Sequence, residues 1–133
     1  MEHQNYLFPV FLKLSELETL IVGGGNIALE KITAIISNCP LAKVTIVAPE
    51  IKRELLEISD NHASITILER EFEEKDLEGK DIVIIATADP VLNQEVKKLA
   101  QKAKVLANVV DTPAICDFYL GSIVKKGQVK IAI

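Results

Sequence analysis

Apolar residues in this chain alternate between short continuous runs and segments in which they recur every three or four positions. Continuous β-branched runs are typical of strands covered on both faces, and the longer spacing is typical of helices. Strands are therefore predicted at residues 17–22, 43–48, 64–68, 81–86 and 105–110. Helices are predicted after Gly25, from Pro49 and from Pro90, where Asp89 precedes as a helix cap. The acidic stretch 69–78 is expected to be a solvated connection with a helical turn.

This alternation of strands and helices predicts an α/β fold. Because helical crossovers between parallel strands are right-handed, the expected architecture is a Rossmann-type doubly wound parallel sheet in the order 3-2-1-4-5. Residues 122–124 and 129–133 flank a glycine-containing turn and are predicted as additional strands at one sheet edge. The apolar segment 6–12 is expected to pack as a strand-like flank. Ligands of such sheets bind beyond the carboxyl ends of the strands, where the strand order reverses.

Composition narrows the class of protein. The 133 residues predict a single domain, 1–133, and 49% hydrophobic residues suffice for a core without disulfides or a metal. Cys39 and Cys116 show neither disulfide nor metal-ligand spacing. A net charge of −4 and 5% aromatic residues argue against a nucleic-acid surface. No apolar run approaches the roughly 18 residues of a membrane span, and Lys13 is the first basic residue, so a cytoplasmic protein with small-molecule ligands is expected.

The loop after the first strand carries the most specific pattern. Gly23, Gly25 and Ala28 form a G-x-G-x-x-A motif between a predicted strand and a predicted helix. Gly23 lets the chain turn, Gly25 lets a pyrophosphate approach the backbone, and Ala28 lets helix and strand pack closely. This pattern favours dinucleotide binding over an ordinary glycine-rich turn.

The end of the second strand departs from the usual fingerprint, which has an acidic residue there for the adenosine ribose. Ala48 occupies that position, so either Glu50 or the backbone at Ala48 and Pro49 is expected to reach the ribose. An equally good role for Glu50 is a favourable charge in the first turn of the next helix. Lys52 and Arg53 leave the choice between NAD and NADP open.

Polar residues also follow the fourth and fifth strands. Thr87 is positioned to contact the ribose or nicotinamide half of a cofactor, and Asp111 puts a carboxylate just beyond a strand end. Asp111 before Thr-Pro is equally typical of a turn former. Cys116 has no adjacent base and is expected to pack, and His3 and His62 have no arrangement that suggests catalysis.

Together these residues resemble the precorrin-2 dehydrogenase family, the nucleotide-binding part of siroheme synthases. The resemblance covers nearly the whole chain in one order, through residues 7–12, 21–28 with Lys31, 47–50, 86–89 with Asn93, 108–113 and 116–118. It implies NAD-dependent oxidation of precorrin-2 to sirohydrochlorin, and some members also insert ferrous iron as a substrate. By position, Asn26, Ile27, Pro49 and Glu50 match NAD contacts, and Asp111 matches the catalytic aspartate.

The predicted site therefore has Asp111 as the base that accepts a proton during dehydrogenation, and no resident metal. The same carboxylate is a hypothetical proton acceptor when iron replaces the two N–H protons of the macrocycle. The predicted cofactor-binding residues are Gly23, Gly24, Gly25, Asn26, Ile27, Ala48, Pro49, Glu50, Thr87 and Asn108.

Two departures from the family pattern predict a chain that binds NAD yet, by itself, turns over precorrin-2 slowly or not at all. Gly121 stands where members usually have proline, and the C-terminal dimerisation region that makes members homodimers is expected to be missing. Lys125, Lys126 and Lys130 form the clustered positive charge expected to meet the eight carboxylates of the tetrapyrrole. Two alternatives stay open, namely a non-catalytic NAD(H)-sensing module and a chelatase that has lost its redox role.

Overall fold

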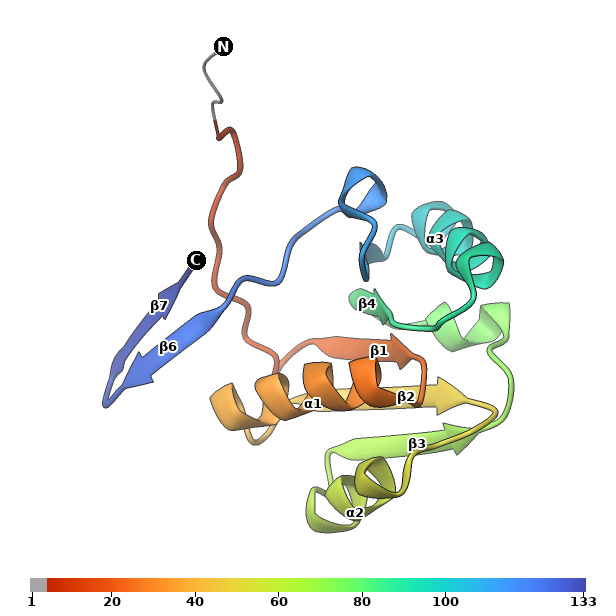
Figure 1. Cartoon of the computed structure of the whole chain (residues 1–133), viewed down its shortest axis with the longest axis horizontal. Helices are drawn as coiled ribbons and strands as arrows, with labels where there is room; N and C mark the ends of the chain where they lie inside the picture. The colour runs from red at the N-terminus through yellow and green to blue at the C-terminus, as the bar shows by residue number, and fades with distance from the viewer. Residues whose placement is uncertain (1–4) are drawn as a thin grey trace.

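Five parallel strands form one sheet in the structure of this chain, a computed structural model that describes residues 5–133. The order β3-β2-β1-β4-β5 confirms the predicted Rossmann-type arrangement (Figure 1). Because β1 pairs with both β2 and β4, the strand order reverses at β1, where ligands of such sheets bind. The strands are β1 (Glu18–Val22), β2 (Lys43–Ala48), β3 (Ile65–Glu69), β4 (Ile82–Ile85) and β5 (Leu106–Val109).

Helices cover both faces of the sheet. The helices are α1 (Asn26–Asn38), α2 (Arg53–Asn61) and α3 (Pro90–Lys102), with short 3-10 turns η1 (Glu74–Leu77) and η2 (Pro113–Ile115). Ile21 and Ile84 pack with α1 and α2, whereas their strand neighbours Leu20 and Ile85 pack with α3 and η1. The strands are continuously apolar because successive side chains enter opposite cores.

Two predicted helix starts have different outcomes. Asp89 accepts hydrogen bonds from the backbone N–H groups of Val91 and Leu92, which confirms it as the cap of α3. The expected helix start at Pro49 is wrong, since α2 begins at Arg53. The intervening chain lies against the first turn instead, where Lys52 N donates to Gly24 O at 2.8 Å.

The free edge of β5 is occupied by the chain that follows it. Ala107 N donates to Asp117 Oδ2 at 2.9 Å, and Asp117 N donates to Ala107 O at 2.8 Å. Val109 N donates to Cys116 Sγ, whose thiol donates in turn to Val109 O. Because these groups already have partners, no further strand pairs with β5.

The C-terminal strands form the predicted hairpin, β6 (Ile123–Lys126) and β7 (Val129–Ala132). Their predicted place at the sheet edge is wrong, because they form a separate two-stranded sheet (Figure 1).

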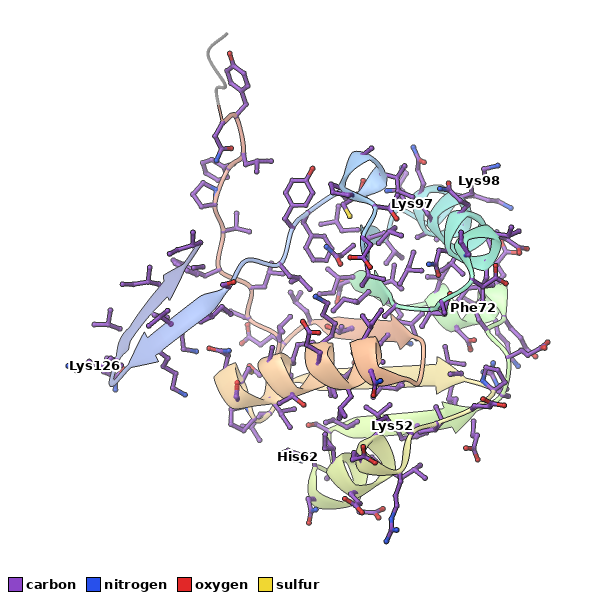
Figure 2. The ribbon with its side chains drawn as sticks, viewed as in Figure 1. Lys52, His62, Phe72, Lys97, Lys98 and Lys126 are labelled. Carbon is purple, nitrogen blue, oxygen red and sulfur yellow. The ribbon has the colours of Figure 1, made fainter. Side chains whose placement is uncertain are left out.

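Two apolar segments lie apart from the core. Residues 6–12 do not pack as expected: Phe8 is 87% exposed and Phe11 is 86% exposed. Both neighbours of β1 are already in place, so this segment has no free strand edge beside β1 to join. The β6–β7 hairpin is also exposed, with Lys126 at its tip (Figure 2). His3 lies outside the described residues.

Within residues 5–133, no helix is long and apolar enough to cross a membrane. The same part of the chain contains no group of three or more His, Cys, Asp or Glu side chains that could hold a metal ion.

Gly23 fixes the crossing between the first turn and the end of β4. Its φ of 136° is a conformation that residues with side chains rarely adopt. A Cβ at this position would also lie 2.3 Å from the carbonyl oxygen of Ala86. The turn can therefore approach β4 only because residue 23 has no side chain.

Gly23→Ala should lower the free energy of unfolding by about 3 kcal/mol, because it adds both backbone strain and a backbone clash. Gly25→Ala is the matched control, since a Cβ there meets no atom within 4 Å. The control should cost at most about 1 kcal/mol, through the poorer helix cap. Urea denaturation measures the free energy of unfolding of both variants, and equal losses in the two would contradict the proposed role of Gly23.

Candidate functional site

The start of α1 is open and uncapped. Gly25 is its N-cap residue; no side chain caps the helix, and its first turn contains no acidic residue. The first N–H groups of a helix have no partner within the helix, so they can bind an anion there. Ala28 is fully buried beneath this turn, as the motif predicts. The fit to a pyrophosphate thus rests on exposed backbone donors and on the free space at Gly25.

The loop after β2 is held against the same turn. A Cβ on Gly24 would lie 2.2 Å from the carbonyl oxygen of Glu50, so Gly24 permits the two loops to meet. Pro49 and Glu50 are exposed, and Ala48 is buried at the end of β2. Because α2 begins only at Arg53, the expected role of Glu50 as a charge in its first turn is wrong.

The two cations that follow this loop are both paired with glutamates of α2. Lys52 Nζ lies 3.1 Å from Glu54, and Arg53 Nε lies 3.2 Å from Glu57. The hydrogen bond from Lys52 lowers the pKa of Glu54. Both cations are thus engaged with neighbouring carboxylates of α2.

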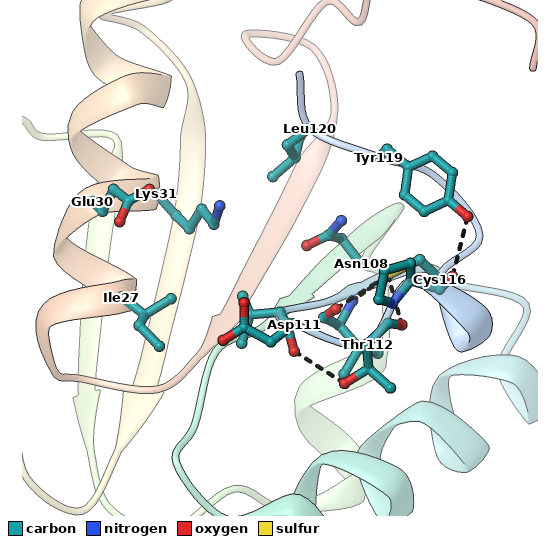
Figure 3. Close-up of a pocket in the computed structure, with 12 residues that line it drawn as sticks. Ile27, Glu30, Lys31, Asn108, Asp111, Thr112, Cys116, Tyr119 and Leu120 are labelled. Atoms are coloured by element: carbon teal, nitrogen blue, oxygen red, sulfur yellow. Dashed lines mark hydrogen bonds between the residues drawn. The ribbon is translucent and has the colours of Figure 1, made fainter. Parts of the chain in front are cut away.

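Two hollows adjoin at the carboxyl ends of the strands. The first, about 300 Å³, lies between α1 and the chain after β5, and the second, about 380 Å³, lies between α1 and the chain after β4. Figure 3 shows the first hollow with Asp111 at its lower wall. Four residues line both hollows: Ile27, Val110, Asp111 and Thr112. A ligand in either hollow would therefore meet Asp111.

Asp111 combines a turn conformation with a free carboxylate. Its φ of 56° is left-handed, a conformation that Asp tolerates better than most residues. The turn is closed by Thr112 N donating to Val109 O. Within the described residues, no hydrogen bond or ion pair engages the Asp111 carboxylate. The turn-former interpretation and the functional one are thus compatible, because the backbone makes the turn and the side chain faces the hollows.

The loop that carries Asp111 is anchored at its far end. The Asp117 carboxylate accepts from Ala107 N and pairs with Lys97 Nζ at 2.8 Å, and Lys97 is 9% exposed. Asn108 Nδ2 donates to Phe118 O at 3.0 Å. Since residues on both sides of Asp111 are tied to β5, the position of its carboxylate is set by the loop as a whole.

The other residues considered in the sequence are two predicted cofactor contacts, which line the hollows, and two side chains that bond nearby backbone groups. Thr87 lines the second hollow, where its hydroxyl is hydrogen-bonded to the Asn93 side chain. Asn108, predicted as a cofactor contact, lines the first hollow away from the glycine turn. The Cys116 thiol bonds backbone groups of β5, as expected for packing. His62 bonds its own helix through Ile58 O.

The positive charge expected near the substrate lies elsewhere. Lys125 and Lys130 donate to the carbonyls of Ser37 and Asn38, at the C-terminal end of α1, and do not line either hollow. Lys31 lines the first hollow, although in the sequence it stands out only as part of the family motif. Its spacing of four residues from Ile27 is the signal that could have identified it.

Comparisons with known proteins agree with this geometry. The chain matches the family described as "Putative NAD(P)-binding" over residues 10–122. It is 35% identical to a siroheme synthase of Vesicomyosocius okutanii subsp. Calyptogena okutanii over 97% of this chain and 27% of that protein. It is 36% identical to a siroheme synthase of Thioalkalivibrio sulfidiphilus over 95% of this chain and 25% of that protein. The chain thus spans about a quarter of the length of these relatives.

A solved structure described as "SirC, precorrin-2 dehydrogenase" superposes with a TM-score of 0.75 at 25% identity. The match covers 96% of this chain and 61% of that chain. Together with the sequence relatives, it confirms the resemblance to the precorrin-2 dehydrogenase family and the fold expected from it.

The Asp117 anchor makes stability depend on pH. Burial opposes ionisation of Asp117, but hydrogen bonds from Lys97 and Ala107 N outweigh burial and lower its pKa. A lowered carboxyl pKa contributes stability at neutral pH that is lost as the pH falls through the folded-state value.

Asp117→Asn should therefore lower the free energy of unfolding at pH 7 by about 1–2 kcal/mol. This figure is already reduced for solvent screening, because Asp117 is partly exposed. The gap to wild type should close as the pH falls below the usual range of a carboxyl group. Asp60→Asn, at an exposed position on α2, removes the same charge and should change little at any pH. Urea denaturation across pH measures this, and a gap that persists in acid would argue against the ion pair.

Proposed function

The chain belongs to the NAD(P)-binding family that it matches over residues 10–122, and on this premise we propose that it is an NAD-dependent precorrin-2 dehydrogenase of siroheme biosynthesis. The observation that carries the proposal is the Asp111 carboxylate, which has no partner among the described residues and lies in the wall shared by two hollows. The two hollows lie side by side near the start of α1. A cofactor and a substrate that react with each other must bind in such adjoining spaces.

The residues at the first turn fit a dinucleotide. Gly25 and the backbone N–H groups of Asn26 and Ile27 would hold the pyrophosphate, and the exposed segment at Pro49 and Glu50 would meet the adenosine ribose. Thr87 would face the other half of the cofactor from the second hollow. Bound NAD would supply the hydride acceptor that the side chains lack.

Asp111 would act as the general base. Oxidation of precorrin-2 removes a hydride and a proton, and the proton needs an acceptor within reach of the substrate. Asp111 has no other partner among the described residues, so its oxygen lone pairs are available for that proton. The left-handed turn presents it to both hollows at once.

Several finer features are part of the same proposal. Ferrous iron would be a second substrate, with Asp111 accepting the protons that the macrocycle loses as iron enters. We also propose a cytoplasmic location, and a homodimer in the full-length relatives. These features follow from the resemblance and require separate tests.

Asp111→Asn should abolish NADH formation from precorrin-2, because the amide cannot accept the proton. Asn tolerates the left-handed conformation as well as Asp does, so the fold should be kept. NADH absorbance measures turnover, and calorimetry should find the NAD⁺ affinity of the variant within about twofold of wild type.

An active Asp111→Asn variant would refute the role of base. A wild-type chain that binds NAD⁺ but never reduces it with precorrin-2 would instead favour a nucleotide-sensing module. Assaying the wild type and the Asp111→Asn variant in parallel distinguishes these two outcomes.

Gly25→Val should weaken NAD⁺ binding by at least about tenfold, because a branched side chain would fill the space in which the pyrophosphate approaches the backbone. Its φ of −104° is accessible to valine, so the turn itself should survive. Calorimetry with NAD⁺ measures the loss, and Ala63→Val, at an exposed position just before β3 and remote from the turn, controls for general damage. If the chelatase alternative holds, iron insertion should survive Gly25→Val.

A further inference from the structure

A cation without a partner projects into the first hollow. Lys31 lies on α1 four residues after Ile27, so both side chains leave the same face of the helix. Figure 3 shows the Lys31 side chain extending from α1 into the space before Asn108 and Leu120. The residue is half-buried, and within residues 5–133 its ammonium group has neither a hydrogen bond nor an ion pair.

The chain pairs comparable cations elsewhere. Lys97 bonds Asp117 at 2.8 Å, and Arg70 bonds Asp76 at 2.6 Å. Such pairing compensates the hydration that burial removes from a charge. Lys80 is also half-buried and unpaired, but it precedes β4 at the opposite end of the strands and lines neither hollow. Lys31 is thus the unpaired cation that faces a ligand-sized space.

The walls of this hollow carry opposite charges that do not meet. Among residues 5–133, neither the Asp111 carboxylate nor the Lys31 ammonium has a partner, and no ion pair joins them. Glu30 also lines the hollow but lies exposed on α1. Asn108 holds Phe118 O through its amide nitrogen and adds no charge. A ligand that spans the hollow would therefore place an anionic group at Lys31 and its reacting centre near Asp111.

We propose that Lys31 binds a peripheral carboxylate of the tetrapyrrole and so orients the macrocycle toward Asp111. This inference rests on the proposed function, and it names the group that recognises the substrate. An ammonium–carboxylate hydrogen bond is among the stronger polar contacts, so one such bond can fix an orientation. Lys125 and Lys130 of the hairpin are already engaged with the end of α1.

The test compares Lys31→Met with Lys31→Arg and with Lys80→Met in the 133-residue chain. Lys31→Met should raise the KM for precorrin-2 about tenfold at saturating NAD⁺, because a charged hydrogen bond to the substrate is lost. Lys31→Arg keeps the charge and should largely restore KM, and Lys80→Met should leave it unchanged. NAD⁺ affinity, measured by calorimetry, should stay within about twofold for all three.

A second readout does not depend on turnover. Uroporphyrin, a stable octacarboxylate tetrapyrrole, serves as the probe, and its fluorescence reports binding. Lys31→Met should weaken uroporphyrin binding about tenfold and make the affinity less sensitive to salt, because one screened charge contact is lost.

The outcomes separate this inference from the proposed function. If wild type oxidises precorrin-2 but Lys31→Met retains its KM and its uroporphyrin affinity, the inference is overturned and the function stands. If uroporphyrin binding depends on Lys31 while no oxidation occurs, the inference stands and the proposed function fails. Absence of uroporphyrin binding to wild type overturns the inference.

Discussion

The close contact of three loops at Gly23 and Gly24 is the constraint on which the site depends. A side chain at Gly23 would strike the carbonyl of Ala86 after β4, and one at Gly24 would strike the carbonyl of Glu50 after β2. Without these contacts the start of α1 could not lie beside both neighbouring strand ends. The open space at Gly25 and the uncapped helix start follow from that convergence. The proposed dinucleotide site would thus rest on missing side chains and backbone donors, without a dedicated cation.

The loop after β5 joins structural and functional roles in one set of contacts. Its return along β5 satisfies backbone groups that an edge strand would otherwise expose. The same return, held by Asp117 and Lys97, forces the chain through the left-handed turn at Asp111. The closed sheet edge and the presented carboxylate are therefore consequences of one arrangement. For this reason the C-terminal hairpin cannot extend the sheet at β5.

Charged groups in the chain divide by whether they have partners. Paired cations such as Lys97, Arg70 and Lys130 hold loops, turns and the end of α1 in place. Asp111 and Lys31 have no partner in the described part of the chain, and both line the same hollow. Asp111 is exposed, whereas Lys31 is half-buried. Because an unpaired charge is costly to bury, Lys31 is most simply explained by an anionic ligand that completes it. In the proposed function, a carboxylate of the tetrapyrrole would meet Lys31, and a proton of the macrocycle would go to Asp111.

The sequence by itself determined the five strands, their order, the glycine turn and the cap at Asp89. These features depend on local patterns, namely apolar runs, βα alternation and turn residues, which constrain topology through the handedness of crossovers. The tertiary structure alone decided the later start of α2, the separate hairpin, the exposed N-terminal segment and the assignment of lysines to α1 or to the hollow. Each of these depends on contacts between residues distant in the chain, such as Lys52 with Gly24 or Cys116 with Val109, whose geometry no local spacing specifies.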